Sequence, residues 1–266
     1  MTKQAAERLV AARAELNEVL DALALAQFDW PSACPGWSVR DVVAHLGASA
    51  RNAIDPLPPL EGSPQPAVRE RVHDLNVIRR RAWPLEEVLE EFRTYGPQAA
   101  AMAAAVQEEP QAHTPVSMPG LGQYPMHALA NAALFDTYCH LRHDLLAPRG
   151  PLAVAVPDPD HESLYAVIQW MMWGLPQMQG PELVESLVAP VEIRLTGPGQ
   201  STWSVERNAE GTELTVTEDG RAPNTVTSTA HDFVAWATRR QPWMRYTTVE
   251  GDELAVRSFL GVLSII

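Results

Sequence analysis

The chain has 266 residues, 46% of them hydrophobic and 20% charged, enough for one large domain or two smaller ones with separate cores. Its formal net charge is −13, and its densest basic runs, Arg79–Arg81 and Arg239–Arg240, are short. Nucleic-acid binding needs a broad positive surface, so this composition argues against a nucleic-acid partner.

Cysteine content and hydropathy bear on the cellular compartment. Cys34 and Cys139 are too few for a disulfide framework, and we expect that neither is disulfide-bonded and that neither is a nucleophile. No apolar run approaches the roughly eighteen residues that cross a bilayer, so no membrane partner is expected. These features predict a cytoplasmic protein.

The first half of the chain is predicted to be helical. Residues 3–26 carry apolar side chains at the spacing of an amphipathic helix. These side chains are Leu9, Ala12, Leu16, Val19, Leu20 and Leu23. A second helix is predicted over 38–54, because Ser38 and Asp41 have the spacing of a capping box.

Two more helical regions follow, 67–107 with a break at Trp83–Pro84, and 125–146. Loops rich in proline or glycine, 55–66 and 108–123, separate them. Four amphipathic helices with such connections predict an antiparallel bundle. We also expect a solvated acidic face in the third region, formed by Glu86, Glu87, Glu90 and Glu91.

The second half has a different pattern. A helix is predicted over 161–179, with the bulky run Trp170–Trp173 in packing contacts. From residue 190 onward apolar residues alternate with polar ones, which is typical of strands. Helices near 230–239 and 252–263 flank a strand near 245–250. The fold class is therefore α+β: a helical bundle, residues 1–150, followed by a smaller domain with an antiparallel sheet, residues 151–266.

Three side chains on two predicted helices suggest a metal site. Asp136 and His140 are four residues apart, which places them on one helix face about one turn apart. His45 lies in the middle of the second helix and can complete a set of two imidazoles and a carboxylate. Three protein ligands with a fourth position open are typical of a catalytic zinc site.

Simpler interpretations of these residues remain open. A single histidine on an apolar face is more often a hydrogen-bonded core residue than a ligand, and an acid and a histidine at this spacing are often a solvated pair. His143 and Asp144 lie within the same helical turn as His140. The spacing therefore allows several ligand combinations and does not choose among them.

The block Cys34–Leu46 resembles the N-terminal motif of the mycothiol-dependent maleylpyruvate isomerase family, in the DinB-like metal-dependent superfamily. The second half resembles the sterol-carrier-like C-terminal domain of those proteins. The resemblance implies that His45 and His140 are zinc ligands. It also implies that Asp136 stands where the family usually has glutamate, one methylene longer.

The resemblance further implies a reaction. A divalent metal, usually zinc, holds the thiolate of a low-molecular-weight thiol, here mycothiol, which attacks a small electrophile. Isomerases then rotate a bond and eliminate the thiol, whereas transferases release the adduct. Arg239 or Arg240 is expected to bind an anionic substrate in this catalytic role, although surface charge at a helix end is an equally good interpretation of both.

Two other functions fit the same residues. One is a non-catalytic small-molecule binding or resistance protein that keeps the fold. The other is a metal-dependent hydrolase that uses bound water and needs no thiol. In each case the expected partners are small molecules, and we expect a monomer or a homodimer.

Overall fold

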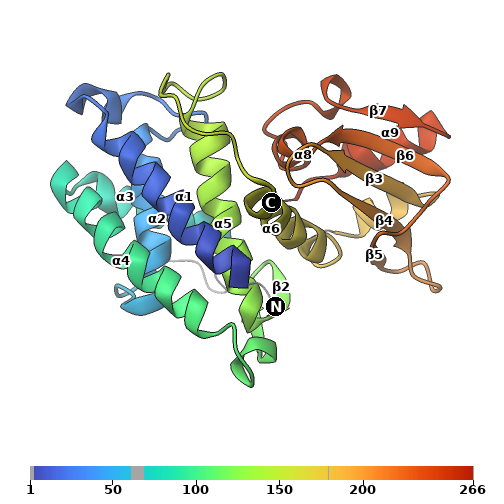
Figure 1. The fold of residues 1–266 in the computed structure, drawn as a ribbon, viewed down its shortest axis with the longest axis horizontal. Helices are drawn as coiled ribbons and strands as arrows, with labels where there is room; N and C mark the ends of the chain where they lie inside the picture. Colours follow the sequence, from blue (N-terminus) through green and yellow to red (C-terminus); the bar gives the residue numbers. More distant parts are fainter. Residues whose placement is uncertain (1–2, 61–68, 179, 266) are drawn as a thin grey trace. The chain divides into compact units, whose positions relative to one another are not determined.

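The computed structural model describes residues 3–60, 69–178 and 180–265. It divides into two compact units (Figure 1), each of which is described by itself. The first unit comprises Met1–Gly120 with Tyr124–Pro157, and the second comprises Leu121–Gln123 with Asp158–Ile266. The first is mainly helical and the second contains a five-stranded sheet, which confirms the α+β class.

The first unit is a helical bundle. Its helices are α1 (Lys3–Asp21), α2 (Val39–Ile54), α3 (Arg69–Arg81), α4 (Leu85–Ala105) and α5 (Leu129–Cys139). Helices α1, α2, α4 and α5 pack against one another, and α3 packs against α2. Their shared core is apolar. Its fully buried members include Leu16, Val42, Val43, Val88 and Leu145.

The start of α2 follows the predicted capping box. The Ser38 hydroxyl accepts a hydrogen bond from the backbone N–H of Asp41, and the Asp41 carboxylate accepts one from the backbone N–H of Ser38. Asp41 also accepts two hydrogen bonds from the guanidinium of Arg81 at the end of α3. The cap therefore fixes the first turn of the helix that carries His45.

Several predicted boundaries differ from the observed ones. Helix α1 ends at Asp21, and the short 3-10 segment Leu25–Asp29 follows it. The predicted loop 108–123 contains most of a two-stranded ribbon, β1 (Pro115–Met118) and β2 (Gly122–Pro125). The helix expected to start at residue 125 begins at Leu129. Of the predicted proline-rich loop, residues 61–66 lie outside the described part of the chain.

The predicted acidic face of α4 is wrong at one position. Glu86, Glu87 and Glu90 are exposed, but Glu91 is 4% exposed. Its carboxylate pairs with Arg80 of α3 and with Arg51 of α2. A buried carboxylate needs such partners, because desolvation without compensation is costly. The ion pair thus ties three helices together through one side chain.

The second unit combines a sheet with helices. Its helices are α6 (His161–Gly174), α7 (Pro181–Ser186), α8 (Ala230–Ala237) and α9 (Glu253–Val262). Its strands are β3 (Val191–Thr196), β4 (Ser201–Arg207), β5 (Leu214–Glu218), β6 (Asn224–Thr229) and β7 (Thr248–Glu250). Helices α8 and α9 pack on the sheet (Figure 1). Trp170, Met171 and Met172 of α6 are buried, in agreement with the predicted packing role.

The predicted alternation of β3 is confirmed, since Ile193 lies opposite Trp203 and beside Val226. The strand order is β5-β4-β3-β6-β7, and three of the four pairings are antiparallel. The predicted antiparallel pairing holds for these three, whereas the pairing of β3 with β6 is parallel, so the sheet is mixed. Alternation reports which face a side chain occupies and carries no information on strand direction.

The parallel pairing needs a crossover, which the short segment 219–223 makes across the polar face of the sheet. A Cβ on Gly220 would lie 2.0 Å from the Ser204 hydroxyl, so the backbone passes close to β4 there. Arg221 donates to the carboxylate of Glu192 at 3.2 Å. The crossover therefore accounts for the burial of Glu192, which is 2% exposed.

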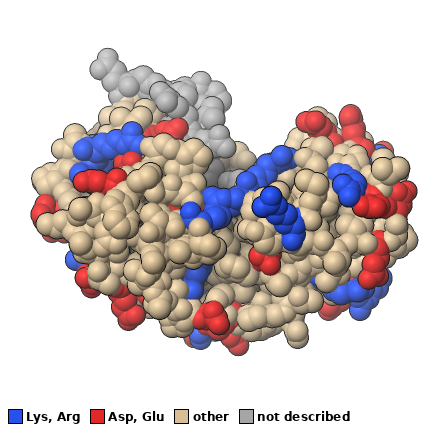
Figure 2. Space-filling model, turned by 90° about the horizontal axis from the view of Figure 1, so that it is seen from above, with Lys and Arg blue, Asp and Glu red and all other residues tan. Residues whose placement is uncertain are grey.

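The displayed surface (Figure 2) has mixed charge, and the described helices are not long apolar segments. Figure 2 shows acidic and basic side chains in small groups, with neutral residues between them, on the face that it displays. Among the described helices, none combines the length and the apolar character that a bilayer span requires.

Removing the cap of α2 should destabilise the first unit. Ser38→Ala deletes the hydroxyl that accepts from Asp41, so the free energy of unfolding should fall by about 1 kcal/mol. Thr94→Ala is the control, because it deletes a hydroxyl from the exposed face of α4 and should change stability by about 0.5 kcal/mol at most. Denaturant unfolding measures both, and equal effects would contradict the role of the cap.

Candidate metal centre

The segment before α2 forms a tight turn. The Trp37 N–H donates to the Cys34 carbonyl at 3.1 Å, with Pro35 and Gly36 between them. Gly36 has a φ of 78°, which is the left-handed conformation that a type II turn requires at this position. Because Ser32 also binds the Trp37 carbonyl, at 2.8 Å, the turn holds the Cys34 and Trp37 side chains in place.

The turn presents Trp37 to the two predicted histidine ligands. Its ring centroid lies 5.2 Å from that of His45 and 6.2 Å from that of His140. The indole N–H donates to Asp74 of α3 at 3.3 Å, which fixes the orientation of the ring. The aromatic side chain thus covers one side of both imidazoles.

The structure brings His45, Asp136 and His140 together. The His45 Nε2 lies 3.3 Å from both carboxylate oxygens of Asp136, and the His140 Nε2 lies 3.4 Å from Oδ1. One donor atom from each side chain lies within 4.8 Å of the others. The histidine side chains are almost buried, whereas that of Asp136 is 28% exposed. The set is therefore open on the carboxylate side.

His140 is held from its other ring nitrogen by Asp144. The Nδ1 of His140 lies 3.0 Å from Asp144 Oδ2 and 3.6 Å from the Cys34 Sγ. Asp144 is 1% exposed, and its Oδ1 lies 3.6 Å from Arg149. A carboxylate behind a histidine is the usual arrangement at metal sites, because it fixes the tautomer that presents Nε2 to the metal.

This arrangement depends on a local change of helix type. After α5 the chain continues as a π-helix, His140–Leu145, and the Leu146 N–H donates to the Leu141 carbonyl at 3.1 Å. The segment stops where Gly150 packs against it. A Cβ on Gly150 would lie 2.2 Å from the Leu145 carbonyl carbon. Such π segments are rare and often occur at functional sites.

The electrostatics of the set favour a cation. Burial alone would raise the pKa of Asp136, but the charge of His45 and hydrogen bonds from both histidines hold that pKa well below its usual value. Burial alone would lower the pKa of His140, yet hydrogen bonds with Asp136, Asp144 and Cys34 raise it well above its usual value. The site thus stabilises positive charge at His140.

The donor chemistry fits a divalent metal. A neutral His140 has one N–H, and both of its nitrogens face carboxylates. With Nδ1–H directed at Asp144, the Nε2 lone pair faces Asp136, which is favourable only with a proton or a cation between them. Two imidazoles and one carboxylate are typical ligands of a catalytic zinc ion. His45 differs, since its buried Nδ1 has no hydrogen-bond partner among the described residues.

The other sequence candidates take different positions. His143 is buried with its ring 5.8 Å from that of Tyr138, and it belongs to neither group of possible metal ligands among the described residues. Neither Cys34 nor Cys139 is disulfide-bonded, as predicted. Cys34 belongs to a second group with His140 and Asp144.

Arg239 and Arg240 lie in the second unit, where they end α8. The Arg239 N–H donates to Trp236 and the Arg240 N–H to Ala235, and Arg239 has a φ of 56°. This is a Schellman motif. The Arg239 guanidinium donates to the carbonyls of Gly261 and Val262 at the end of α9. Their expected role with an anionic substrate stays a prediction.

Two site residues were not assigned a role from the sequence: Trp37 and Asp144. Asp144 had a usable signal, its four-residue spacing from His140. Arg13 is 9% exposed and lies on the apolar face of α1, four residues after Leu9 and three before Leu16. An arginine within the apolar face of a helix is the sequence signal for such a buried charge. The predicted apolar stripe includes the neighbouring Ala12 rather than Arg13.

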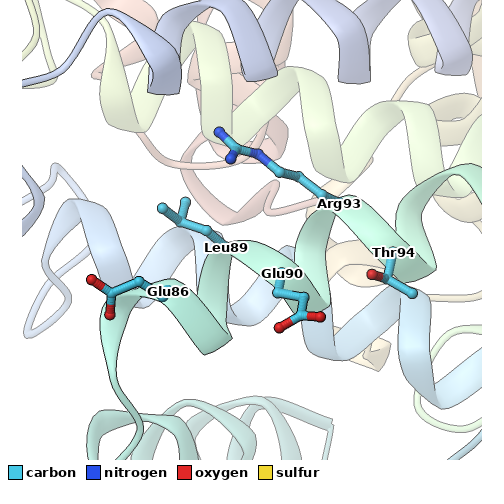
Figure 3. A pocket seen from close by; sticks show the side chains of 5 residues that line it. All are labelled: Glu86, Leu89, Glu90, Arg93 and Thr94. Carbon is cyan, nitrogen blue, oxygen red and sulfur yellow. The ribbon is translucent and has the colours of Figure 1, made fainter.

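A surface hollow on α4 lies apart from these residues. Its lining consists of Glu86, Leu89, Glu90, Arg93 and Thr94 (Figure 3). The side chains project from a single helix, and Arg93 is already paired with Asp21 of α1. None of its members belongs to a possible ligand group among the described residues. It is a shallow feature of the solvated face.

Known proteins of one family are similar to this chain. Residues 9–145, more than half of the chain, match the family model of the mycothiol maleylpyruvate isomerase N-terminal domain. The chain belongs to the mycothiol maleylpyruvate isomerase family. No curated protein matches it significantly.

Two solved structures are similar to the whole chain. One is the mycothiol-dependent maleylpyruvate isomerase, with 11% identity and a TM-score of 0.57. The other is a single-site mutant of that enzyme, with 10% identity and a TM-score of 0.56. Each comparison covers 94% of this chain and 93% of the other. At this level of identity the likeness establishes the shared fold.

Asp144→Asn should weaken metal binding without unfolding the protein. The amide keeps the shape but removes the charge that orients His140, so affinity for a divalent ion should fall about 10- to 100-fold. Asp74→Asn is the matched control, since Asp74 accepts from Trp37 rather than from a candidate ligand. Competition titration with a chromogenic chelator measures both, and an unchanged affinity in Asp144→Asn would contradict this role.

Proposed function

We propose that this protein is a metal-dependent enzyme that activates a low-molecular-weight thiol, mycothiol, for attack on a small electrophile. The observation that supports it is the convergence of His45, Asp136 and His140, with their donor atoms within 4.8 Å, in a member of this family. The reaction is either an isomerisation or an S-transfer. Residues 1–150 form the metal-binding domain in this proposal, and residues 151–266 form the sterol-carrier-like domain.

Each residue has a distinct part in the proposal. His45, Asp136 and His140 hold the divalent cation, which we propose to be zinc, and leave a position for the thiol. A cation there lowers the pKa of the thiol, so that the thiolate forms near neutral pH. Asp144 fixes the tautomer of His140. Trp37 excludes water from one side of the imidazoles, which strengthens the local electrostatics.

The aspartate at position 136 does not disrupt this set. Its carboxylate is one methylene shorter than the glutamate usual in the family, but it lies within 3.4 Å of both Nε2 atoms. Because α2 and the π segment after α5 hold the two histidines this close, the shorter side chain reaches them. Zinc tolerates either carboxylate, so the donor set is chemically equivalent.

His45→Ala should abolish stoichiometric metal. Protein purified without chelator should hold about one equivalent of zinc, and the variant should hold almost none, because two ligands bind far more weakly than three. His143→Gln is the control, since His143 belongs to no ligand group among the described residues. Elemental analysis with circular dichroism checks both. A full equivalent at this site in folded His45→Ala would make the assignment wrong.

Binding of mycothiol should release protons. A thiol that becomes a metal-held thiolate loses its proton, so calorimetry at pH 7 in buffers of different ionisation enthalpy should report close to one proton released. Metal-free protein should bind the thiol much more weakly. Equal binding to metal-free protein, or binding without proton release, would contradict thiol activation.

Turnover assays then separate the alternatives. Maleylpyruvate is the first substrate to test, because the similar solved structures are of a maleylpyruvate isomerase. Product formation that requires thiol supports the proposal, and the product distinguishes isomer from adduct. Turnover without thiol would indicate a hydrolase. Tight small-molecule binding without any turnover would indicate a binding protein.

A further inference from the structure

The interior of the first unit contains a buried arginine, Arg13 of α1. Its Nη2 lies 3.4 Å from the carbonyl oxygen of Leu46, and its guanidinium carbon lies 4.9 Å from the centroid of the Phe92 ring. Helix α4 makes room for it at Gly96, where a Cβ would lie 2.6 Å from the arginine Nε. The site is therefore shaped around the guanidinium.

Arg13 has more hydrogen-bond donors than acceptors. A guanidinium offers five N–H donors, and within the described part of the chain the Leu46 carbonyl is its one acceptor. No carboxylate of a described residue forms an ion pair with it. Arg80, which is also buried, instead pairs with Glu91 and donates to the Asn76 carbonyl. Arg13 is thus buried without the partner that buried charges normally have.

The position of Arg13 relates it to the candidate metal centre. Its acceptor, Leu46, follows His45 directly on α2. Burial lowers the pKa of Arg13 to about 10, and the charge of Asp136 opposes that shift, so the two charges interact. Asp136 itself is engaged by His45 and His140. Arg13 therefore contacts the residue next to His45 and interacts electrostatically with Asp136, without forming an ion pair with it among the described residues.

The charges of this interior sum to an excess of positive charge. A divalent cation with neutral His45 and His140 and an ionised Asp136 leaves one positive charge, and Arg13 adds a second. A bound thiolate neutralises one of them. Asp144 does not neutralise the other, because it is already paired with Arg149. One monovalent anionic group is needed to balance a buried site of this kind.

We infer that Arg13 binds a carboxylate of the electrophile. The inference rests on the proposed function, which brings the electrophile to the thiol at His45, Asp136 and His140. A guanidinium matches a carboxylate through two parallel N–H donors, and this match is stronger and more specific than that of an ammonium. Arg13 is in this sense a substrate-binding residue of the centre.

The test compares a carboxylate probe with its neutral ester. Calorimetry on the zinc-loaded full chain, without thiol, should show maleate binding at least about 10-fold more tightly than dimethyl maleate, as expected for hydrogen bonds between charged groups. Arg13→Met should lose most of this preference, and Arg13→Lys should keep part of it. Arg93→Met is the control, because Arg93 is exposed and paired with Asp21.

The outcomes separate a substrate-binding role of Arg13 from a purely structural one. An unchanged preference in folded, zinc-loaded Arg13→Met, or no preference in the parent protein, would overturn the inference. If Arg13→Met does not fold, Arg13→Lys is the deciding variant, because it keeps the positive charge but lacks the planar guanidinium. Full maleate affinity in Arg13→Lys would overturn the inference. Zinc content and thiol-linked proton release are measured on the same samples. An Arg13-dependent preference without thiol-linked proton release would refute the proposed function alone.

Discussion

The arrangement of the candidate centre depends on one imidazole held between two carboxylates. His140 faces Asp136 with one nitrogen and Asp144 with the other, at 3.4 and 3.0 Å. Asp144 is positioned in turn by the π segment, and its carbonyl accepts from the Ala33 N–H at 2.9 Å, which ties the Cys34–Trp37 turn to the same helix end. The turn, the π segment and the ligand set are therefore one connected structure rather than three independent features.

Among the bundle residues whose burial is described, Arg13 and Arg80 are buried in different ways. The charge of Arg80 is neutralised by the Glu91 carboxylate, and this ion pair joins α3 to α4. Arg13 has a carbonyl and an aromatic ring as neighbours, and its charge is left for something else to balance. Uncompensated buried charge costs stability, and it persists in proteins mainly where function uses it. The contrast between these residues separates a structural arginine from one available to a ligand.

Much of this could be predicted from the sequence, where local rules were sufficient. The Ser38–Asp41 cap, the helical face shared by Asp136 and His140, and the alternation of β3 each depend on spacing within one element. What was missed depends on neighbours distant in sequence. The pattern within α4 predicts an exposed Glu91. Its burial depends on Arg80, which belongs to another helix. The parallel direction of β6 depends on a crossover that alternation does not encode, and the end of the π segment packs against Gly150, which lies outside it.

The substrate question turns on which guanidinium meets the electrophile. The sequence predicts that Arg239 or Arg240 binds an anionic substrate, because a guanidinium matches a carboxylate. In the second unit the Arg239 guanidinium already binds two carbonyl oxygens at the end of α9, where a cation is favoured by the helix dipole. Recruiting it for a substrate would leave those carbonyls without that donor. Binding of a substrate carboxylate by Arg13 would break no such hydrogen bonds. The carboxylate oxygens would instead accept from guanidinium N–H groups that have no acceptor among the described residues. On physical grounds the buried arginine beside the ligand set is the better anion site.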